Sequence, residues 1–555
     1  MYKYNVLFLL AALSCASLTP PRRRCKFGDS CWPDEQTWQS FNNSISGRLV
    51  QTVPSAAACH GSTFNPEQCQ TAKEEWDNSF WRTNQTGAYT AIVWELGNQQ
   101  CFINSSRSAP CEPGLVPHYS VAATSVADVQ AAVKFASEKD LYLVVKNTGH
   151  DHLGRSSGQG AFSIWTHKLK GRQWTDNFVV EGAPPGTKGI PAVTLQPGEQ
   201  WLDVYRAASE RHVIVVGGQA RTVGAAGGWL TGGGHSAWSH IYGLGVDNVL
   251  EVTLVNAQGK HVTVNQYTDP DYFWALRGGG GSAWGVITSV TYRTHPEPSH
   301  IQIAALQLNA TADSSLRPVL EGSLGALVNM TDHGYTGYGY FSNGFSAIFV
   351  RPNGTEEELL KGSAPFRELA KLDGTSFLMV NFTFPSWIDF CNAFLQDPNI
   401  AQNVMDSSRL LTTDMALNKA DQIIDMMLGY APENYPSFNF IGKVNSATRN
   451  DTSVHPSWRD SRAVMSFGTN WEDNAPETEK HRKKLQLVEM SNRWAKIAGS
   501  DGGTYVNEAN PYEPAWQKVF WGSNYDRLLG IKRAKDPTNL FLCNRCVGTD
   551  VVYEP

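Results

Sequence analysis

Glycine is concentrated in one stretch of the sequence, residues 217–235, which reads GGQARTVGAAGGWLTGGGH and holds eight glycines. A second run spans Gly278 to Gly281, and the segment KNTGH at 146–150 contributes another glycine nearby. Because glycine has no Cβ, such loops let the backbone approach a ligand closely and direct successive N–H groups at an anion. One run alone would be explained by tight turns, but three such segments in one region predict a ligand-binding site.

Alternating helices and strands surround these loops. A capping-box-like Ser-x-x-Asp begins at Ser125 and is followed by apolar residues at helical spacing. The other expected elements alternate in the same way: a strand at 141–145, a helix at 201–212, a strand at 213–216, a hairpin over 250–264, a helix at 271–276 and a strand at 286–292. The alternation over 117–298 predicts a mixed α/β domain with glycine loops at its strand ends.

Several common motifs are absent or misleading. Gly278-x-Gly280-x-x-Ala283 superficially matches the Rossmann fingerprint, but it follows a helix-like segment where that fingerprint requires a strand. The sequence contains no Walker A, HExxH, GxSxG or EF-hand pattern, which excludes the commonest classes of NTPase, metalloprotease and hydrolase. His150-Asp151-His152 has the alternate histidines of a copper or zinc site, but a copper oxidase would need several such pairs. We therefore expect no metal.

Charge and hydropathy narrow the class of partner. Lysine and arginine number 46 against 52 acidic residues, so the net charge is −6, and there is no basic stripe. The mean hydropathy is −0.32, and no long apolar run follows the first twenty residues. We expect a folded, soluble protein that acts on a small molecule, with neither nucleic acid nor membrane as partner.

The first 16 residues predict a signal peptide. Lys3 supplies the positive start, residues 6–13 the apolar stretch, and Ser14-Cys15-Ala16 the small-residue cleavage site. Eight N-x-S/T sequons agree with export: Asn42, Asn84, Asn104, Asn309, Asn329, Asn353, Asn381 and Asn450. The sequence therefore predicts a secreted, N-glycosylated protein.

Nine cysteines remain after the signal peptide is removed. Six lie between Cys25 and Cys111, which predicts a disulfide-linked N-terminal region over 17–116 whose pairing the sequence leaves open. Cys543-x-x-Cys546 is compatible with a redox or zinc pair, but it follows a strand-like segment and has no further ligands nearby, so a disulfide is preferred. Cys391 is the expected free thiol.

The rest of the chain divides into two parts. Residues 299–500 contain longer helices, expected at 356–369 and 477–498, and strands rich in tyrosine and phenylalanine. This change of character predicts a second domain. Residues 501–555 are again punctuated by aromatic residues, Asn and Gly, as expected of a segment that returns to the first domain.

The segment KNTGHD at 146–151, followed by GRSSG at 154–158, resembles the flavin-attachment segment of vanillyl-alcohol oxidase / p-cresol methylhydroxylase type FAD proteins, most closely their berberine-bridge-like fungal branch. Three further blocks agree: 222–235, YGLGVDNV at 242–249 and WGSNYDRL at 521–528. The resemblance covers 117–298 and 505–549 and is weak over 299–500. It implies an α+β fold in which a two-subdomain FAD-binding α/β domain (117–298) is joined by a substrate domain with an antiparallel sheet covered by helices.

The same resemblance implies FAD as the cofactor, attached through an 8α-histidyl bond to His150, since imidazole is a good nucleophile toward the flavin methyl group. Doubly attached relatives have a cysteine at the position of Ala220, so we expect no cysteinyl link. The other residues that the resemblance assigns to the cofactor are Lys146, Asn147, Thr148, Gly149, Asp151, Thr222, Gly224, Gly227, Gly233, Gly234, His235, Ile287 and Asn524.

The implied reaction is hydride transfer from a substrate C–H to FAD, followed by reoxidation by molecular oxygen to give hydrogen peroxide. Val223 matches a position that influences oxygen access in relatives, and its small side chain favours an oxidase, although core packing explains it equally well. The catalytic base cannot be assigned from the sequence. Asp451, Tyr340 and Glu508 are weak candidates, Tyr338, Glu472 and Asn507 are further alternatives, and Asp451 belongs to the Asn450 sequon, whose glycosylation would place it at the surface.

The sequence thus predicts a secreted FAD-linked oxidase that acts on an alcohol, an amine or a natural-product intermediate. One alternative is a sugar or oligosaccharide oxidase, although such enzymes commonly carry the second attachment that Ala220 argues against. The other alternative is a flavin-binding glycoprotein without turnover.

Overall fold

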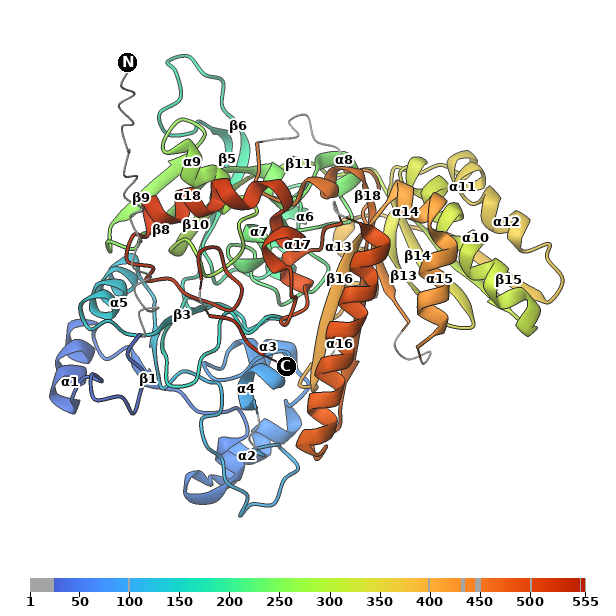
Figure 1. Cartoon of the computed structure of the whole chain (residues 1–555). Helices are drawn as coiled ribbons and strands as arrows, with labels where there is room; N and C mark the ends of the chain where they lie inside the picture. The colour runs from blue at the N-terminus through green and yellow to red at the C-terminus, as the bar shows by residue number, and fades with distance from the viewer. Residues whose placement is uncertain are drawn as a thin grey trace, which may run out of the picture.

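The computed structural model describes residues 24–97, 100–397, 400–430, 435–444, 451–499, 502–549 and 551–554. The expected signal peptide (1–16) and Asn450 lie outside these residues. In Figure 1 the blue-to-green part of the chain forms one half of the molecule, and the yellow-to-orange part forms a second half beside it. Among the described residues, no helix is both long enough and apolar enough to cross a bilayer.

The first half contains a four-stranded sheet whose strands lie in the order β1 (Leu49–Gln51), β2 (Tyr119–Ala122), β4 (Phe162–Trp165), β3 (Leu143–Lys146). Strands β2, β4 and β3 are parallel, whereas β1 is antiparallel to β2. Helix α5 (Val126–Glu138) lies between β2 and β3 in the chain, and its Ser125–Asp128 capping box is present as predicted. The segment KNTGHD (146–151) begins at Lys146, the last residue of β3.

A second, antiparallel sheet in this half has the order β5 (Arg172–Phe178), β6 (Ile190–Leu195), β10 (Val286–Arg293), β8 (Val249–Val255), β9 (His261–Asn265). Two short strands, β7 (Val213–Ile214) and β11 (His295–Pro296), pair separately. The helices among these strands are α6 (Trp201–Ser209), α7 (Gly228–Thr231), α8 (Ser239–Tyr242) and α9 (Pro270–Leu276). The expected mixture of helices, strands and glycine loops is confirmed, and the run at Gly278 follows a helix as predicted.

The second half is built on a seven-stranded antiparallel sheet in the order β15 (Thr375–Phe384), β12 (Ile301–Ala310), β14 (Gly344–Pro352), β13 (Thr336–Phe341), β17 (Ser437–Phe440), β18 (Ser461–Asn470), β16 (Val404–Thr412). The helices of this half are α10 (Asp313–Asp332), α11 (Glu356–Gly362), α12 (Ala364–Leu369), α13 (Trp387–Phe394), α14 (Thr413–Asn418), α15 (Ala420–Leu428) and α16 (Glu477–Ala498). Helix α10 packs on β12 and β14, and α16 packs on β16 and β18. An antiparallel sheet covered by helices is therefore confirmed.

Two details of the second half differ from the sequence prediction. The helix expected at 356–369 is two helices, α11 and α12, that meet at Ser363, because Pro365 lacks the N–H that a continuous helix would need. Helix α10 was not predicted, although it has 20 residues.

The C-terminal segment crosses back to the first half. It contains a short helical turn, η6 (Val506–Glu508), and the helices α17 (Trp516–Trp521) and α18 (Tyr525–Lys535). Helix α18, in red in Figure 1, packs against α9 of the first half. Beyond α18, Phe541 forms a parallel bridge with Leu143 of β3. This return brings η6 to the place where the two halves meet.

The N-terminal region is closed by local disulfides, Cys25–Cys31, Cys59–Cys69 and Cys101–Cys111, while Cys543 pairs with Cys546 near the C-terminus. Cys391 is the buried free thiol among the described residues, as predicted. The helices of this region are α1 (Glu35–Ser44), α2 (Pro66–Glu74), α3 (Ser79–Thr83) and α4 (Val93–Leu96). A buried ion pair, Arg82 Nη2 to Glu95 Oε2 at 2.8 Å, joins α3 to α4 and fixes the segment between them.

Candidate active site

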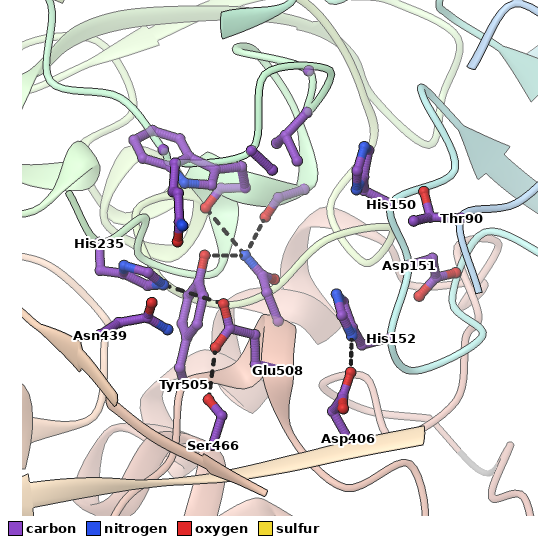
Figure 2. Close-up of a pocket in the computed structure, with 18 of the residues that line it drawn as sticks. Thr90, His150, Asp151, His152, His235, Asp406, Asn439, Ser466, Tyr505 and Glu508 are labelled. Carbon is purple, nitrogen blue, oxygen red and sulfur yellow. Dashed lines mark hydrogen bonds and ion pairs between the residues drawn. The ribbon is translucent and has the colours of Figure 1, made fainter. Parts of the chain in front are cut away.

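A cavity of about 930 Å³ lies where the two halves and the returning C-terminal segment meet. This volume is near the upper end of ordinary ligand pockets, which span about 300–1,000 Å³. One wall is formed by the loops after β3 and around the two glycine runs, and the opposite wall is one face of the seven-stranded sheet together with η6. Figure 2 shows the side chains that point into it.

His150 lies in the loop after β3 and faces the cavity. Its Nε2 lies 2.7 Å from Thr222 Oγ1. Burial lowers the pKa of His150 to about 4, although the charge of Asp397 opposes the shift. The ring is therefore neutral near pH 7, and in the tautomer in which Nε2 donates to Thr222 the lone pair lies on Nδ1. A neutral imidazole with a lone pair is the nucleophilic form.

Thr222 is itself held in place from two other parts of the chain. Its backbone N–H donates to Asp397 Oδ1 at 3.1 Å, and Ser79 of α3 donates to Asp397 Oδ2 at 2.6 Å. The N-terminal region thus helps to fix the orientation of His150. It also reaches the cavity directly, since Thr90 lines the wall and donates its backbone N–H to Gly149 O at 3.0 Å.

The glycines that line this wall are closely packed. A Cβ on Gly224 would lie 2.3 Å from Asn147 Nδ2, and one on Gly227 would lie 3.3 Å from the same atom. Gly149 has φ +86°, and a Cβ there would meet Ala88 O at 2.9 Å. Asn147 Nδ2 donates to Pro197 O, whereas its buried Oδ1 has no partner among the described residues. An orphaned acceptor at the wall of a glycine-lined cavity is a place for a ligand donor.

A histidine–carboxylate pair lies across the cavity. His235 Nε2 donates to Glu508 Oε1 at 3.1 Å, and Ser466 of β18 donates to Glu508 Oε2 at 3.3 Å. Burial opposes ionisation of Glu508, but the hydrogen bonds from His235 and Ser466 and the charges of His235 and His152 hold its pKa below the ordinary value. Tyr505 packs edge-on against His235 with ring centroids 5.0 Å apart. The pair can therefore hold a proton that leaves a substrate.

A second pair of this kind joins the two halves. His152 Nδ1 lies 2.8 Å from Asp406 Oδ2, and both side chains line the cavity. Burial works against protonation of His152, but its hydrogen bond to Asp406 and the charges of Asp406, Glu508 and Asp151 raise its pKa to about 9. His150 and His152, two residues apart, thus have opposite protonation states at neutral pH.

The sheet face presents two rows of side chains that follow the strand register toward the edge strand β15. One row, which we call the Asn439 row, consists of Asn439, Tyr338, Ile348, Ala305 and Val380. The other, the Ser466 row, consists of Ser466, Ser437, Tyr340, Ser346, Gln307 and Leu378. Tyr340, Leu378 and Val380 are about half exposed and form the open end of the cavity.

The structure brings most of the sequence-predicted residues to the cavity: Asn147, Thr148, Gly149, His150, Asp151, Ala220, Val223, Gly224, Gly227, His235, Ile287, Tyr338, Tyr340, Asn507 and Glu508. Thr222 does not line the wall, but its hydroxyl is hydrogen-bonded to His150 Nε2. Gly233 and Gly234 do not line the wall, and a Cβ on Gly234 would meet the Trp229 ring at 2.8 Å, so this glycine makes room for Trp229.

Other predicted residues lie elsewhere. Lys146 Nζ donates to Gln85 O at 2.9 Å beneath the loop, and Asn524 Nδ2 donates to Val454 O at 2.8 Å. Asp451, a candidate base, does not line the cavity, because it is paired with Arg277 at 3.4 Å. Glu472 is also absent from the wall. Of the acidic candidates, Glu508 is the one that the structure brings to the cavity.

Sequence reasoning missed four polar groups of the substrate-side wall: Asp406, Asn439, Ser466 and Tyr505 were not considered. Asp406, Asn439 and Ser466 come from three strands and Tyr505 directly precedes η6, so they are distant in the sequence and no local spacing could have joined them. On the flavin-side loop, His152 was considered only as a metal ligand.

The arrangement of a glycine-loop domain against a helix-covered antiparallel sheet is the fold of VAO-type flavoproteins. Residues 117–265 match the model of the FAD binding domain, and residues 504–547 match that of berberine and berberine-like proteins. A VAO-type flavoprotein of Myceliophthora thermophila, MtVAO615, superposes with a TM-score of 0.87 at 29% identity, covering 95% of this chain and 97% of its own.

Two curated relatives carry the comparison further. An uncharacterized FAD-linked oxidoreductase of Arthroderma benhamiae is 55% identical over 560 residues, covering 99% of each chain. The FAD-linked oxidoreductase ZEB1 of Gibberella zeae is 33% identical, covering 98% of this chain and 96% of its own. The chain belongs to the family of FAD-linked oxidoreductases. The residues present fit FAD, since the glycine-lined wall, the orphaned Asn147 Oδ1 and the neutral imidazole of His150 face one cavity.

Proposed function

We propose that this FAD-linked oxidoreductase is a secreted oxidase that holds FAD covalently through His150 and uses molecular oxygen as electron acceptor. The observation that carries the attachment is the geometry of His150, whose Nε2 is engaged by Thr222 at 2.7 Å while the ring remains neutral. The free Nδ1 is then the nitrogen that forms the bond. Ala220 at the cavity wall supplies no thiol, so the attachment is single.

Bound FAD would accept a hydride equivalent from the substrate and pass its electrons to oxygen. The chain itself must hold the cofactor, orient the substrate and remove a proton. Asn147, Gly149, Gly224 and Gly227 form the close wall against the cofactor. Val223 lines the same wall with a small side chain, which leaves space for oxygen.

The His235–Glu508 pair is the proton acceptor in this proposal. Glu508 is held ionised and accepts from His235 Nε2 at 3.1 Å, so in the neutral form of His235 the lone pair lies on Nδ1 and can take the proton. The carboxylate then stabilises the imidazolium, as in other acid–histidine pairs. Tyr505 and Ser466 fix the positions of the two partners.

The substrate lies along the sheet face. The Asn439 row becomes apolar toward β15, which suits an alcohol or natural-product intermediate with an apolar body. A sugar oxidase is the second candidate, because the Ser466 row offers hydroxyl and amide groups beside the exposed ring of Tyr340. Secretion is supported by four disulfides, which persist in oxidising compartments.

The test is peroxide production by the holoprotein with panels of alcohols, amines and sugars. Peroxide with any one panel supports the oxidase. If a compound from any panel reduces the flavin anaerobically but no compound yields peroxide in air, the protein is a dehydrogenase. The proposal that oxygen is the electron acceptor is then wrong. If no compound reduces the flavin, the result favours the alternative that the protein is a flavin-binding glycoprotein without turnover.

A further inference from the structure

The proposed function assigns no role to Asp397, a buried carboxylate that joins three parts of the chain. Asp397 follows helix α13 of the second half, its side chain is 2% exposed, and it does not line the cavity. Its Oδ1 accepts from the backbone N–H of Thr222 at 3.1 Å, and its Oδ2 accepts from the Ser79 hydroxyl at 2.6 Å. The Arg221 Nε lies 3.9 Å from the same Oδ2. Groups from the flavin-binding half and from the N-terminal region thus offset the cost of burying this charge.

Ser79 is positioned by its own helix in the N-terminal region. It is the first residue of α3, and the preceding Asn78 caps that helix by accepting from backbone N–H groups of the first turn. In the same helix, Arg82 forms the buried ion pair with Glu95 of α4. The hydroxyl is therefore fixed by contacts within the N-terminal region, and it reaches Asp397 only when that region is docked on the two halves.

Thr222 carries the connection from Asp397 to His150. Its hydroxyl oxygen lies 2.7 Å from His150 Nε2. Because a hydroxyl both donates and accepts, Thr222 can accept from Nε2–H while the ring is free. It can donate to the same nitrogen once Nδ1 carries the flavin and Nε2 has lost its proton. One residue therefore holds the ring in a single orientation before and after attachment.

The charge of Asp397 also acts on His150. It raises the pKa of the ring, but burial has the larger effect and keeps the imidazole neutral. When Nδ1 forms a bond with the flavin, the ring gains a positive charge until the Nε2 proton leaves. A fixed carboxylate stabilises this charge as it develops, without protonating the nucleophile beforehand.

We propose that Asp397 is a positioning residue for the covalent attachment of FAD to His150, and that Ser79 of the N-terminal region completes this function. The inference rests on the proposed function and adds the residues on which attachment depends. In the attachment step the lone pair of His150 Nδ1 forms a bond to the 8α carbon of the flavin, and one C–H bond of that carbon breaks. The carbon is oxidised, since the C–H electron pair passes through the flavin ring to molecular oxygen. The C–H proton and the Nε2 proton complete hydrogen peroxide.

Asp397→Asn tests the charge, because the amide has nearly the size of the carboxylate. Full-length protein from riboflavin-starved cells is incubated with FAD in air, and acid precipitation at intervals measures the covalent flavin, while ultrafiltration measures total bound flavin. Total binding should match wild type, but attachment should slow about 10- to 100-fold, as for the loss of one charge-assisted interaction. Asp373→Asn is the matched control, because that carboxylate is exposed and lies outside the cavity wall, and it should attach flavin at the wild-type rate.

Ser79→Ala separates the contact with the N-terminal region from the charge. It removes one hydrogen bond to Asp397 and leaves the carboxylate in place. Attachment should therefore slow about three- to tenfold, with total bound flavin unchanged. This variant also decides the question if Asp397→Asn fails to fold.

Wild-type attachment rates in folded Asp397→Asn and Ser79→Ala would overturn the inference. So would a fall in total bound flavin that accounts for the whole loss of covalent flavin, because Asp397 would then only maintain the binding site. Both results leave covalent attachment standing if the wild-type protein keeps its flavin in acid. A wild-type rate in Ser79→Ala alone contradicts the part of the N-terminal region. If wild type itself releases all of its flavin in acid, the covalent part of the proposed function is wrong and the inference is wrong with it.

Discussion

The two walls of the cavity are built in different ways. The flavin-side wall comes mainly from continuous loops, chiefly 147–156 and 218–235, in which glycines bring the backbone close to the ligand. The substrate-side wall comes from single side chains on separate strands and on η6. A cofactor wall thus depends on backbone shape, whereas a substrate wall depends on a few side chains that a stable sheet holds apart. Changes that displace the backbone or its close contacts on the first wall should affect flavin retention, and changes of the side chains on the second should affect turnover.

The largest effect is expected on the substrate wall. Glu508→Gln keeps the size of the side chain but removes the charge that stabilises the protonated form of His235. We expect kcat to fall about 100- to 10,000-fold, the usual contribution of general base catalysis, with flavin content unchanged. Ser466→Ala removes only the 3.3 Å hydrogen bond to Glu508 and should cost far less. Rapid mixing with substrate measures the rate of flavin reduction in both variants. Loss of flavin in Glu508→Gln would contradict the expectation that the substrate-side wall affects turnover and not flavin retention.

The matching change on the flavin wall is Gly224→Ala. Its Cβ would lie 2.3 Å from Asn147 Nδ2, which is held by Pro197, so Asn147 must shift away from the cofactor. We expect most of the bound flavin to be lost, measured as the ratio of flavin to protein absorbance. Gly530→Ala in α18 is the control, because a Cβ there has nothing within 4 Å and the residue does not line the cavity. Equal flavin content in the two variants would show that the close approach at Gly224 is unimportant.

The pH dependence of substrate oxidation should report the charge of His152, one of the two histidines of the loop. His152 has a raised pKa of about 9, stabilised by Asp406 of β16, Glu508 of η6 and Asp151 of its own loop. Its positive charge is therefore present below pH 9 and is lost as the pH rises through that value. We expect substrate oxidation to decline above about pH 9, and in Asp406→Asn at a lower pH. If wild type and Asp406→Asn have identical pH profiles, the charge of His152 has no part in substrate oxidation.

The smallest effect is expected from Val223→Leu. The longer side chain enters the cavity wall and should slow reoxidation by oxygen, about tenfold if one hydrophobic group obstructs the path at a cost of about 1.4 kcal/mol. Flavin reduction by substrate should change less. Stopped-flow mixing of the reduced enzyme with oxygen measures this step, and an unchanged rate would leave Val223 with a packing role alone.

The same contrast explains what the sequence could predict. The capping box at Ser125, the helix 477–498 and the glycine loops depend on residues that are near one another in the chain, and the structure contains all of them. Local spacing also carried the resemblance at KNTGHD, and hence the placement of His150 at the cavity. These features depend on local geometry that a single sequence displays.

The substrate wall depends on pairings that a single sequence does not display. Asp406 reaches the cavity because β16 pairs with β18 and not with its neighbour in the chain. Glu508 becomes the acidic candidate because the C-terminal segment returns beside Ser466. Asp451 was equally plausible by composition, but Arg277 holds it elsewhere. The contribution of Thr90 was unpredictable for the same reason, since it depends on how the N-terminal region packs.

The central claim is that the neutral imidazole of His150 binds the flavin covalently. The most direct measurement is acid precipitation of the purified protein, followed by mapping of the flavin-bearing peptide. The account predicts that the precipitate stays yellow, that the flavin lies on the peptide containing His150, and that His150→Ala releases all of it. A colourless precipitate, or flavin that remains covalently bound in His150→Ala, would contradict the account.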